Sequence, residues 1–406
     1  MQQIMSIFVI ISIILLDFLT AKGIKSGFPI FSSRNWQKIK YAIIVQAVVA
    51  ISIALFGVLF QKKISDFRII ALYYYFFGGV AALYAPKSIY ALFVIFDWSV
   101  AKIKNQKSKI KNCRYGFWVS LPVTCVVVWG ILFGQYNFKV ENIEVACSNL
   151  PQAFNNYKIV QISDVHTGSF ARSSHRFQKV VDLINEQKPD LIVMTGDIVN
   201  NFADELIAFI PIFSQLNAHD GKFAVLGNHD YGGYYKWKNP ADSVANFNAL
   251  VGNIEEMGFE FLNNRAVIIQ RGDADSIALT GVENWGVLKR FPKRADLNKA
   301  LNPVRDVQFK VLITHDPSLW AKEVEGKTDI ALTLTGHTHG MQMGVKIGDK
   351  RYTPAPLFPR FRRHSIGLYK TGEQYLYISR GLGVIGFPAR IGMPPEITVI
   401  TLKNQK

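Results

Sequence analysis

The apolar residues of this chain follow two patterns, and the change between them lies near residue 138. Before it, long apolar stretches alternate with short basic loops; after it, short apolar runs alternate with polar and helix-type segments. Long uncharged runs are typical of membrane spans, whereas short runs between helical patterns are typical of an α/β domain. We therefore expect a transmembrane anchor module over residues 1–137 and a second domain over residues 138–406.

Four apolar segments in the first part predict an all-α module of about four membrane helices, over residues 4–19, 41–60, 69–98 and 117–133. The second segment has 20 residues without a charge, which is long enough to cross a bilayer. The third is interrupted by Pro86 and Lys87, and we interpret it as one long or kinked span because 30 residues cannot supply two. Pro122 in the fourth is tolerable, since neighbouring groups can satisfy the freed carbonyl.

Two alternatives concern this module. Residues 4–19 could be a signal peptide, but they lack a basic leading segment and a small-residue cleavage site. The whole module could also be a buried, soluble helical domain. A transport or sensing protein built on these spans is disfavoured, because they carry few ionisable residues beyond Asp17 and Lys87.

The formal charge of +16 is concentrated in the anchor module. Residues 1–139 hold 16 Lys and Arg against three acids, whereas residues 140–406 hold 30 against 27. The second domain is therefore nearly neutral, and we expect no nucleic-acid partner. If the basic loops around residues 22–40 and 102–114 are cytoplasmic, both termini and the second domain lie on the extracytoplasmic side.

The second domain is predicted to be an α/β sandwich with one or more mixed sheets. Strands are expected at 138–146, 157–163, 190–195, 222–226, 266–270, 276–281, 309–314, 330–335, 375–379 and 397–402. Helices are expected near 173–187, 204–215 and 242–257.

Residues suited to bind metal come directly after five of these strands, namely Asp164, Asp197, Asn228, His315 and His337. In open α/β sheets, sites gather beyond the carboxyl ends of strands, so these side chains are expected to meet.

Each motif has an ordinary alternative when it stands alone. Asp164-Val-His166 could be a surface loop, Gly196-Asp197 a turn, His315 a structural histidine, and Gly336-His337-Thr338-His339-Gly340 a histidine-rich surface turn. Gly227-Asn228-His229-Asp230 after an apolar strand is moderately specific, and the two histidines between glycines in the turn 336–340 are a strong metal signal. Five of the eight histidines fall in these motifs, which favours a metal centre over five separate coincidences.

The ordered set of motifs resembles the calcineurin-like metallophosphoesterase superfamily, and within it the bacterial transmembrane metallophosphoesterases. The stretches Ser379-Arg380-Gly381-Leu382-Gly383 and Pro394-Pro395-Glu396-Ile397 resemble that subgroup too. The resemblance implies a four-layer α/β sandwich over residues 138–406, in a protein of the bacterial inner membrane. It also implies two divalent ions (Mn, Fe or Zn). One would be held by Asp164, His166, Asp197 and His339, and the other by Asp197, Asn228, His315 and His337.

The implied function is hydrolysis of a phosphodiester, phosphomonoester or pyrophosphate by a metal-activated water. Lipid-linked or envelope compounds are the expected substrates, since the domain is tethered to a bilayer. His229 adjoins a ligand without being one and is our candidate general acid, with Asp230 orienting its other nitrogen. A rival role for His229 is charge stabilisation. The alternative function is a non-catalytic metal-binding or sensing module on a membrane anchor.

Softer signals remain. This chain has Met341 where the subgroup usually has a second glycine. The shape of the substrate pocket is therefore not implied by the resemblance. Residues 354–369 mix aromatic and basic side chains, and either a solvated loop or a membrane- or anion-facing loop would explain them. The pattern Gly381-Leu-Gly383-Val-Ile-Gly386 matches a dinucleotide fingerprint, but the prolines that follow predict a loop instead of the required helix. Tyr231, Tyr234 and Trp285 are either pocket or core residues.

Overall fold

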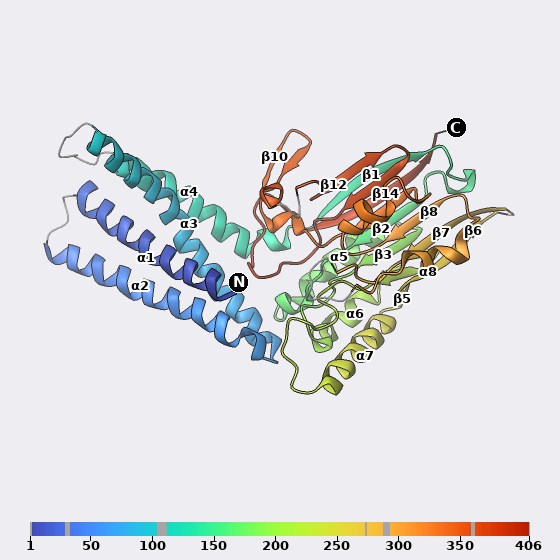
Figure 1. Cartoon of the computed structure of the whole chain (residues 1–406), viewed down its shortest axis with the longest axis horizontal. Coiled ribbons are helices and arrows are strands. Elements are labelled where there is room, and N and C mark those ends of the chain that lie inside the picture. The colour runs from blue at the N-terminus through green and yellow to red at the C-terminus, as the bar shows by residue number, and fades with distance from the viewer. Residues whose placement is uncertain are drawn as a thin grey trace. The chain divides into compact units, whose positions relative to one another are not determined.

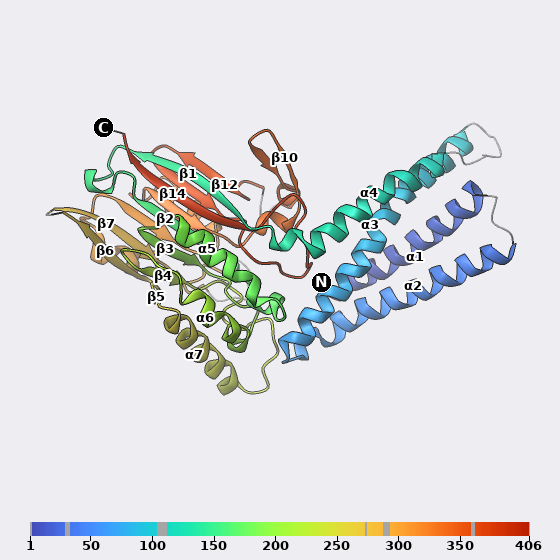
Figure 2. The same cartoon turned by 180° about the vertical axis from the view of Figure 1, so that it is seen from behind.

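The computed structural model describes residues 2–28, 33–103, 112–272, 274–286, 293–358 and 362–405. The chain forms two compact units (Figures 1 and 2). One comprises Met1–Gly134 with Gly386–Ala389, and the other comprises Gln135–Ile385 with Arg390–Lys406.

The first unit contains four long helices, α1 (Gln2–Gly27), α2 (Ser33–Phe60), α3 (Phe67–Ile103) and α4 (Asn112–Leu132). Helix α3 continues through Pro86, as expected for one long span. Among the described residues, three helical stretches are long and apolar enough to cross a membrane, Arg34–Lys63, Phe67–Ile103 and Asn112–Tyr136. The predicted segment 4–19 lies on α1, which is not among these three.

A polar contact joins α1 to α3 inside this unit. The Tyr84 hydroxyl donates to Asp17 Oδ2 over 2.7 Å, and Lys87 Nζ pairs with Asp17 Oδ1. Asp17 is only 6% exposed, so an unpaired carboxylate there would be costly. Asp17 and Lys87 therefore neutralise each other.

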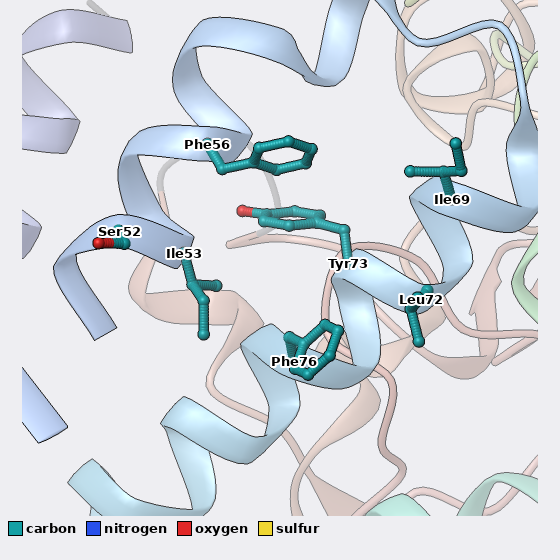
Figure 3. Close-up of a pocket in the computed structure, with 7 residues that line it drawn as sticks. All are labelled: Ser52, Ile53, Phe56, Ile69, Leu72, Tyr73 and Phe76. Carbon is teal, nitrogen blue, oxygen red and sulfur yellow. The ribbon is translucent and has the colours of Figure 1, made fainter. Parts of the chain in front are cut away.

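Helices α2 and α3 also line a cavity of about 340 Å³ (Figure 3). Its walls are apolar apart from Ser52 and the hydroxyl of Tyr73, whose ring lies 5.8 Å from that of Phe56. Because the lining offers no charged side chain, this cavity is not suited to phosphate chemistry.

The second unit contains two six-stranded mixed sheets. The first has the order β1 (Lys139–Cys147), β14 (Glu396–Asn404), β2 (Lys158–Ile162), β3 (Leu191–Thr195), β4 (Lys222–Val225) and β5 (Glu260–Phe261). The second has the order β12 (Gly367–Thr371), β13 (Gln374–Ile378), β9 (Leu332–Thr335), β8 (Lys310–Ile313), β7 (Asp275–Gly281) and β6 (Arg265–Arg271). A separate hairpin pairs β10 (Val345–Ile347) with β11 (Lys350–Tyr352).

Three apolar layers fix the stacking of these sheets. Ile159 and Val193 of the first sheet pack with Leu279 and Val311 of the second, so the sheets face each other. Helices α5 (Gln178–Glu186), α6 (Ile210–Phe213) and α7 (Pro240–Glu256) pack on the outer face of the first sheet. Helix α8 (Leu297–Leu301) and the π-helical turn Trp320–Val324 pack on that of the second. The domain is thus the expected four-layer α/β sandwich.

Interior strands have the composition that this arrangement requires. All five residues of β3 are buried, because its parallel neighbours β2 and β4 and the layers above and below leave no face in water.

The single helix predicted at 204–215 is wrong. The chain forms three short helical pieces there, Ala203–Glu205, Ile207–Phe209 and α6. Pro211 lies in the first turn of α6, where a missing N–H is tolerated.

Candidate metal centre

The predicted ligands lie at the carboxyl ends of parallel strands from both sheets. Asp164, Asp197 and Asn228 follow the adjacent strands β2, β3 and β4. His315 and His337 follow the adjacent strands β8 and β9 of the facing sheet. Because the two sheets face each other, these five endings converge.

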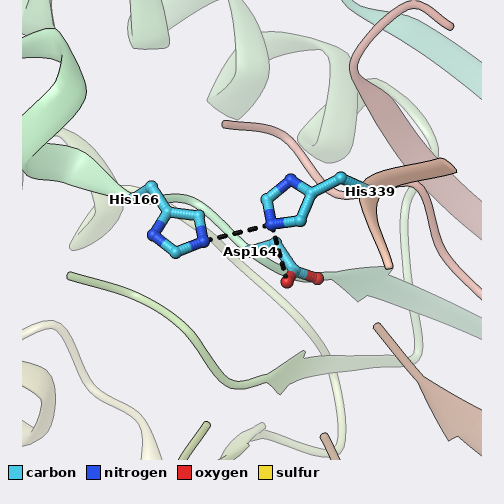
Figure 4. A group of neighbouring side chains, drawn as sticks. All are labelled: Asp164, His166 and His339. Carbon is cyan, nitrogen blue, oxygen red and sulfur yellow. Dashed lines mark hydrogen bonds and ion pairs between the residues drawn. The ribbon is translucent and has the colours of Figure 1, made fainter. Parts of the chain in front are cut away.

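Asp164, His166 and His339 form the first group of potential metal ligands (Figure 4), with one ligand atom of each within 4.8 Å of the others. His339 Nε2 lies 3.2 Å from Asp164 Oδ1 and 3.1 Å from His166 Nε2. Two imidazole nitrogens and a carboxylate oxygen therefore point at one place, as a bound cation would require.

Asp197, His315 and His337 form the second group. His315 Nε2 lies 3.1 Å from Asp197 Oδ2 and 3.0 Å from His337 Nδ1. Asp197 Oδ2 is also 3.7 Å from His166 Nε2 of the first group. Asp197 is placed between the groups and can serve both.

Asn228 has an amide oxygen that needs a partner. Its Oδ1 is buried and accepts no hydrogen bond from any residue that the structure describes, while its Nδ2 donates to the Tyr234 hydroxyl over 2.9 Å. A buried acceptor without a donor is costly, so this oxygen is suited to a cation. Oxygen and imidazole donors without thiolate fit two divalent ions of the Mn, Fe or Zn type.

The ligand loops have an unusual backbone. Positive φ angles occur at Asp164 (48°), His166 (49°), Asp197 (54°), His337 (73°) and His339 (52°). Left-handed conformations are uncommon for residues with a side chain and persist where the surroundings enforce them, often at functional sites. The backbone N–H of His337, for example, donates to both oxygens of Asp164 over 3.0 Å.

Close packing of these loops depends on a glycine. A Cβ at Gly336 would lie 2.0 Å from Ser163 Oγ and 2.1 Å from Asp164 Oδ2. No side chain fits this space, so the glycine before His337 lets the two ligand loops meet.

The electrostatics keep both carboxylates ionised. Burial alone would raise their pKa, but His339 outweighs this for Asp164 and His315 does so for Asp197, whose pKa lies well below its usual range. In the same way, burial would lower the pKa of His315, but the Asp197 charge raises it to about 10. Ionised carboxylates are the form that binds cations.

His229 lies beside the ligands without belonging to either group. Its Nδ1 is 2.9 Å from the Asn200 carbonyl, so Nδ1 carries a proton and Nε2 remains for proton transfer. The ring stacks on Tyr234 at 4.0 Å between centroids and 9° between planes, and its centroid is 4.9 Å from that of His166. The backbone N–H of His229 donates to Asp197 Oδ1 over 2.8 Å.

The expected pairing of Asp230 with His229 is wrong. The Asp230 carboxylate accepts four backbone N–H groups, from Asp197, Ile198, Val199 and Gly227. It therefore ties the Asp197 loop to the Asn228 loop, and the Asn200 carbonyl takes the place beside His229. Burial raises the pKa of Asp230 to about 7.

Two contacts to the ligands were missed in the sequence. Asn200 Oδ1 lies 2.9 Å from His166 Nδ1, so it orients that ring with Nε2 toward the centre. The buried guanidinium of Arg390 lies 3.5 Å from His339 Nδ1 and donates to the carbonyls of Arg380 and Gly383. Asn200 follows Asp197, Ile198 and Val199, and a polar residue there could have indicated a role at the site. No sequence pattern indicated such a role for Arg390.

The structure gives an outcome for two of the softer signals, the three aromatic residues and the glycine-rich stretch, whereas part of the loop 354–369 lies outside the described residues. Tyr234 lies at the site, whereas Tyr231 stacks on Phe247 and Trp285 is buried under the second sheet. The glycine-rich stretch 381–386 forms a loop without a helix, as expected. It supports the site, since the N–H of Leu382 donates to Ser163 O and that of Gly383 to Asp164 O.

Comparison with known proteins agrees with this geometry. The sequence profile of the calcineurin-like phosphoesterase family matches residues 157–341. The chain is 32% identical to the uncharacterized metallophosphoesterase YkuE of Bacillus subtilis, over 64% of this chain and 84% of the relative. It is 30% identical to a transmembrane protein with metallophosphoesterase domain of Danio rerio, over 70% of this chain and 62% of that one. The phosphodiesterase YaeI of Escherichia coli is 27% identical, over 61% and 82%.

Proposed function

The chain belongs to the calcineurin-like phosphoesterase family, and from this premise we propose that it hydrolyses a phosphoric ester with two divalent cations. The observation that carries the proposal is the pair of neighbouring ligand groups. Asp197 belongs to the second group, and its Oδ2 also lies 3.7 Å from His166 Nε2 of the first. Asp164, His166, Asp197 and His339 would hold one ion. Asp197, Asn228, His315 and His337 would hold the other.

The chain's own residues divide the remaining work. When bound, two cations would neutralise the charge of a phosphoryl group and would lower the pKa of a bound water towards neutral pH. His229 donates a proton to the leaving oxygen from Nε2, while the Asn200 carbonyl holds its Nδ1–H. The stacked Tyr234 ring fixes the plane of that imidazole.

The proposal extends to location and substrate. Residues 1–137 anchor the domain of residues 138–406 to a bacterial inner membrane, with the domain on the extracytoplasmic side. The substrate is a phosphodiester, phosphomonoester or pyrophosphate, and a lipid-linked or envelope compound suits an enzyme tethered there. The candidate spans and the relative described as a transmembrane protein support the membrane part.

The direct test is hydrolysis of bis(p-nitrophenyl) phosphate by the purified full-length protein. We expect turnover with Mn²⁺, its loss with a chelator, and its loss in Asp197→Asn, because both ligand groups use that carboxylate. Tight metal binding without hydrolysis in Mn²⁺, Fe²⁺ or Zn²⁺ would contradict the proposal and favour a non-catalytic metal-binding module.

A further inference from the structure

Exposed apolar side chains are concentrated in one short part of the domain, residues 343–358, which we call the hairpin segment. Among the described residues from 135 onward, ten large apolar side chains are exposed, and six of them lie in this segment. They are Met343, Val345, Ile347, Tyr352, Leu357 and Phe358. Single exposed apolar residues are ordinary, but such a concentration indicates a surface that contacts a partner.

The geometry of the hairpin places several of these side chains together. Strands β10 and β11 pair with each other and with neither six-stranded sheet, and Figure 1 shows β10 projecting away from the sheets. Val345 lies opposite Tyr352, and Ile347, two residues along, is on the same face of the strand as Val345. Ile347 is 65% exposed and Val345 is 55% exposed. An isolated two-stranded hairpin is only marginally stable in water, so contact with a partner would also support it.

The charge around this apolar face indicates what the partner is. The described residues of 343–363 include five Lys and Arg and one acid, Asp349. Arg351 and Arg363 pair with Glu141 and Glu325, whereas Lys346, Lys350 and Arg362 are exposed. Exposed basic side chains therefore accompany the apolar ones in this part of the chain. Exposed apolar groups flanked by Lys and Arg fit the surface of an anionic bilayer.

The hairpin segment is tied to the metal centre at both ends. It begins directly after His339–Gln342, the turn that carries a ligand. At its far side, the Thr353 hydroxyl donates to the Gly340 carbonyl and the Thr338 hydroxyl donates to the Ser365 carbonyl, both over 2.6 Å. Whatever the hairpin contacts is thus held in a fixed relation to His339.

We propose that the hairpin segment inserts its apolar face into an anionic bilayer surface and thereby presents the metal centre to a phosphate ester carried by a membrane lipid. This inference rests on the proposed hydrolase function and names its substrate class. We choose a bilayer as the partner because three helical stretches among the described residues are candidate membrane spans.

Insertion is measured on the full-length protein in nanodiscs that contain phosphatidylglycerol. In a Cys125→Ser background, Ile347→Cys carries an environment-sensitive fluorophore, and Val244→Cys is the matched control because Val244 is 58% exposed on α7. We expect lipids bearing a quencher to quench the probe at position 347 and not the one at 244. A water-exposed, unquenched probe at 347 would overturn the proposal and leave a protein partner for this face.

The substrate class is tested with two esters that share a leaving group, a diacylglycerol p-nitrophenyl phosphate in nanodiscs and the water-soluble bis(p-nitrophenyl) phosphate. The double variant Val345→Asp/Ile347→Asp should hydrolyse the lipid ester roughly tenfold more slowly and the soluble ester at the unchanged rate. The control Ile207→Asp/Val244→Asp should leave both rates unchanged. Equal rates on the lipid ester in the hairpin variant would overturn this inference, whereas no hydrolysis of either ester by the unmodified protein would contradict the proposed function itself.

Discussion

The neighbours of His229 fix the plane of its ring and hold its Nδ1 proton, so the proton that a general acid would transfer is a second one, on Nε2. If it protonates the leaving oxygen, its importance depends on how basic that oxygen is. We expect His229→Ala to slow hydrolysis of an alkyl phosphodiester by roughly 10²- to 10⁴-fold and that of a p-nitrophenyl ester much less. Equal losses on both esters would instead indicate charge stabilisation. His219→Ala is the control, because that side chain is 79% exposed.

Asn200 fixes the tautomer of His166, so its effect is expected on metal binding. Removing an acceptor that orients a ligating imidazole lowers metal affinity or activity roughly 10- to 100-fold. Asn200→Ala should therefore weaken Mn²⁺ binding, measured by calorimetry on metal-free protein. Asn298→Ala, an exposed residue on α8, should bind Mn²⁺ like the unmodified protein. Unchanged affinity in Asn200→Ala would contradict the role.

The convergence of the candidate ligands was predictable, whereas the groups that contact them were not. Asp164, Asp197, Asn228, His315 and His337 each follow an apolar strand, so strand ends alone indicated their meeting. Asp230 was assigned to the wrong partner because adjacency in sequence says nothing about which loop a side chain crosses to. The carbonyl that holds His229 and the guanidinium near His339 depend on chain paths that no local pattern encodes.

The stretch 381–386 closely approaches the loop that carries Asp164 and His166. A Cβ at Gly383 would lie 2.0 Å from the Val165 carbonyl oxygen, which is backbone and cannot move aside. We expect Gly383→Ala to destabilise the domain by about 1–3 kcal/mol and to reduce activity with it. Gly252→Ala is the control. It lies in α7 with nothing within 4 Å of the added Cβ, and it should stabilise by about 0.5–1 kcal/mol. Thermal unfolding measures both, and a neutral Gly383→Ala would contradict the close approach.

The strands that were predicted and those that were missed differ in burial. Fully buried strands such as β3, β8 and β9 contain closely spaced apolar residues and were found. The strands β10, β11 and β12 are largely exposed and carry basic residues between apolar ones, so their sequence resembles a solvated loop. The short β5 has only two residues, too few for a periodic signal.

For the whole chain, the proposed sidedness of the domain depends on helix number and loop charge. Three helical stretches are candidate spans. If α1 crosses the membrane as well, both termini are on the same side, and the basic loops after α1 and α3 predict that this side is extracytoplasmic. A C-terminal alkaline phosphatase fusion should therefore be active, and a C-terminal green fluorescent protein fusion should be dark. A dark phosphatase fusion and a fluorescent protein fusion that fluoresces would instead place the domain on the cytoplasmic side.

The place of β14 has a consequence for the order of events during synthesis. This strand is made after all the other described strands, yet it lies inside the first sheet, parallel to β1 and antiparallel to β2. Until residues 396–404 leave the ribosome, β1 has no partner and the strand that leads to Asp164 has an open edge. The preceding helices are made much earlier and are free to enter a bilayer while the domain is incomplete. Assembly of the metal centre is therefore expected to be a late step, well after the four helices of the first unit have been made.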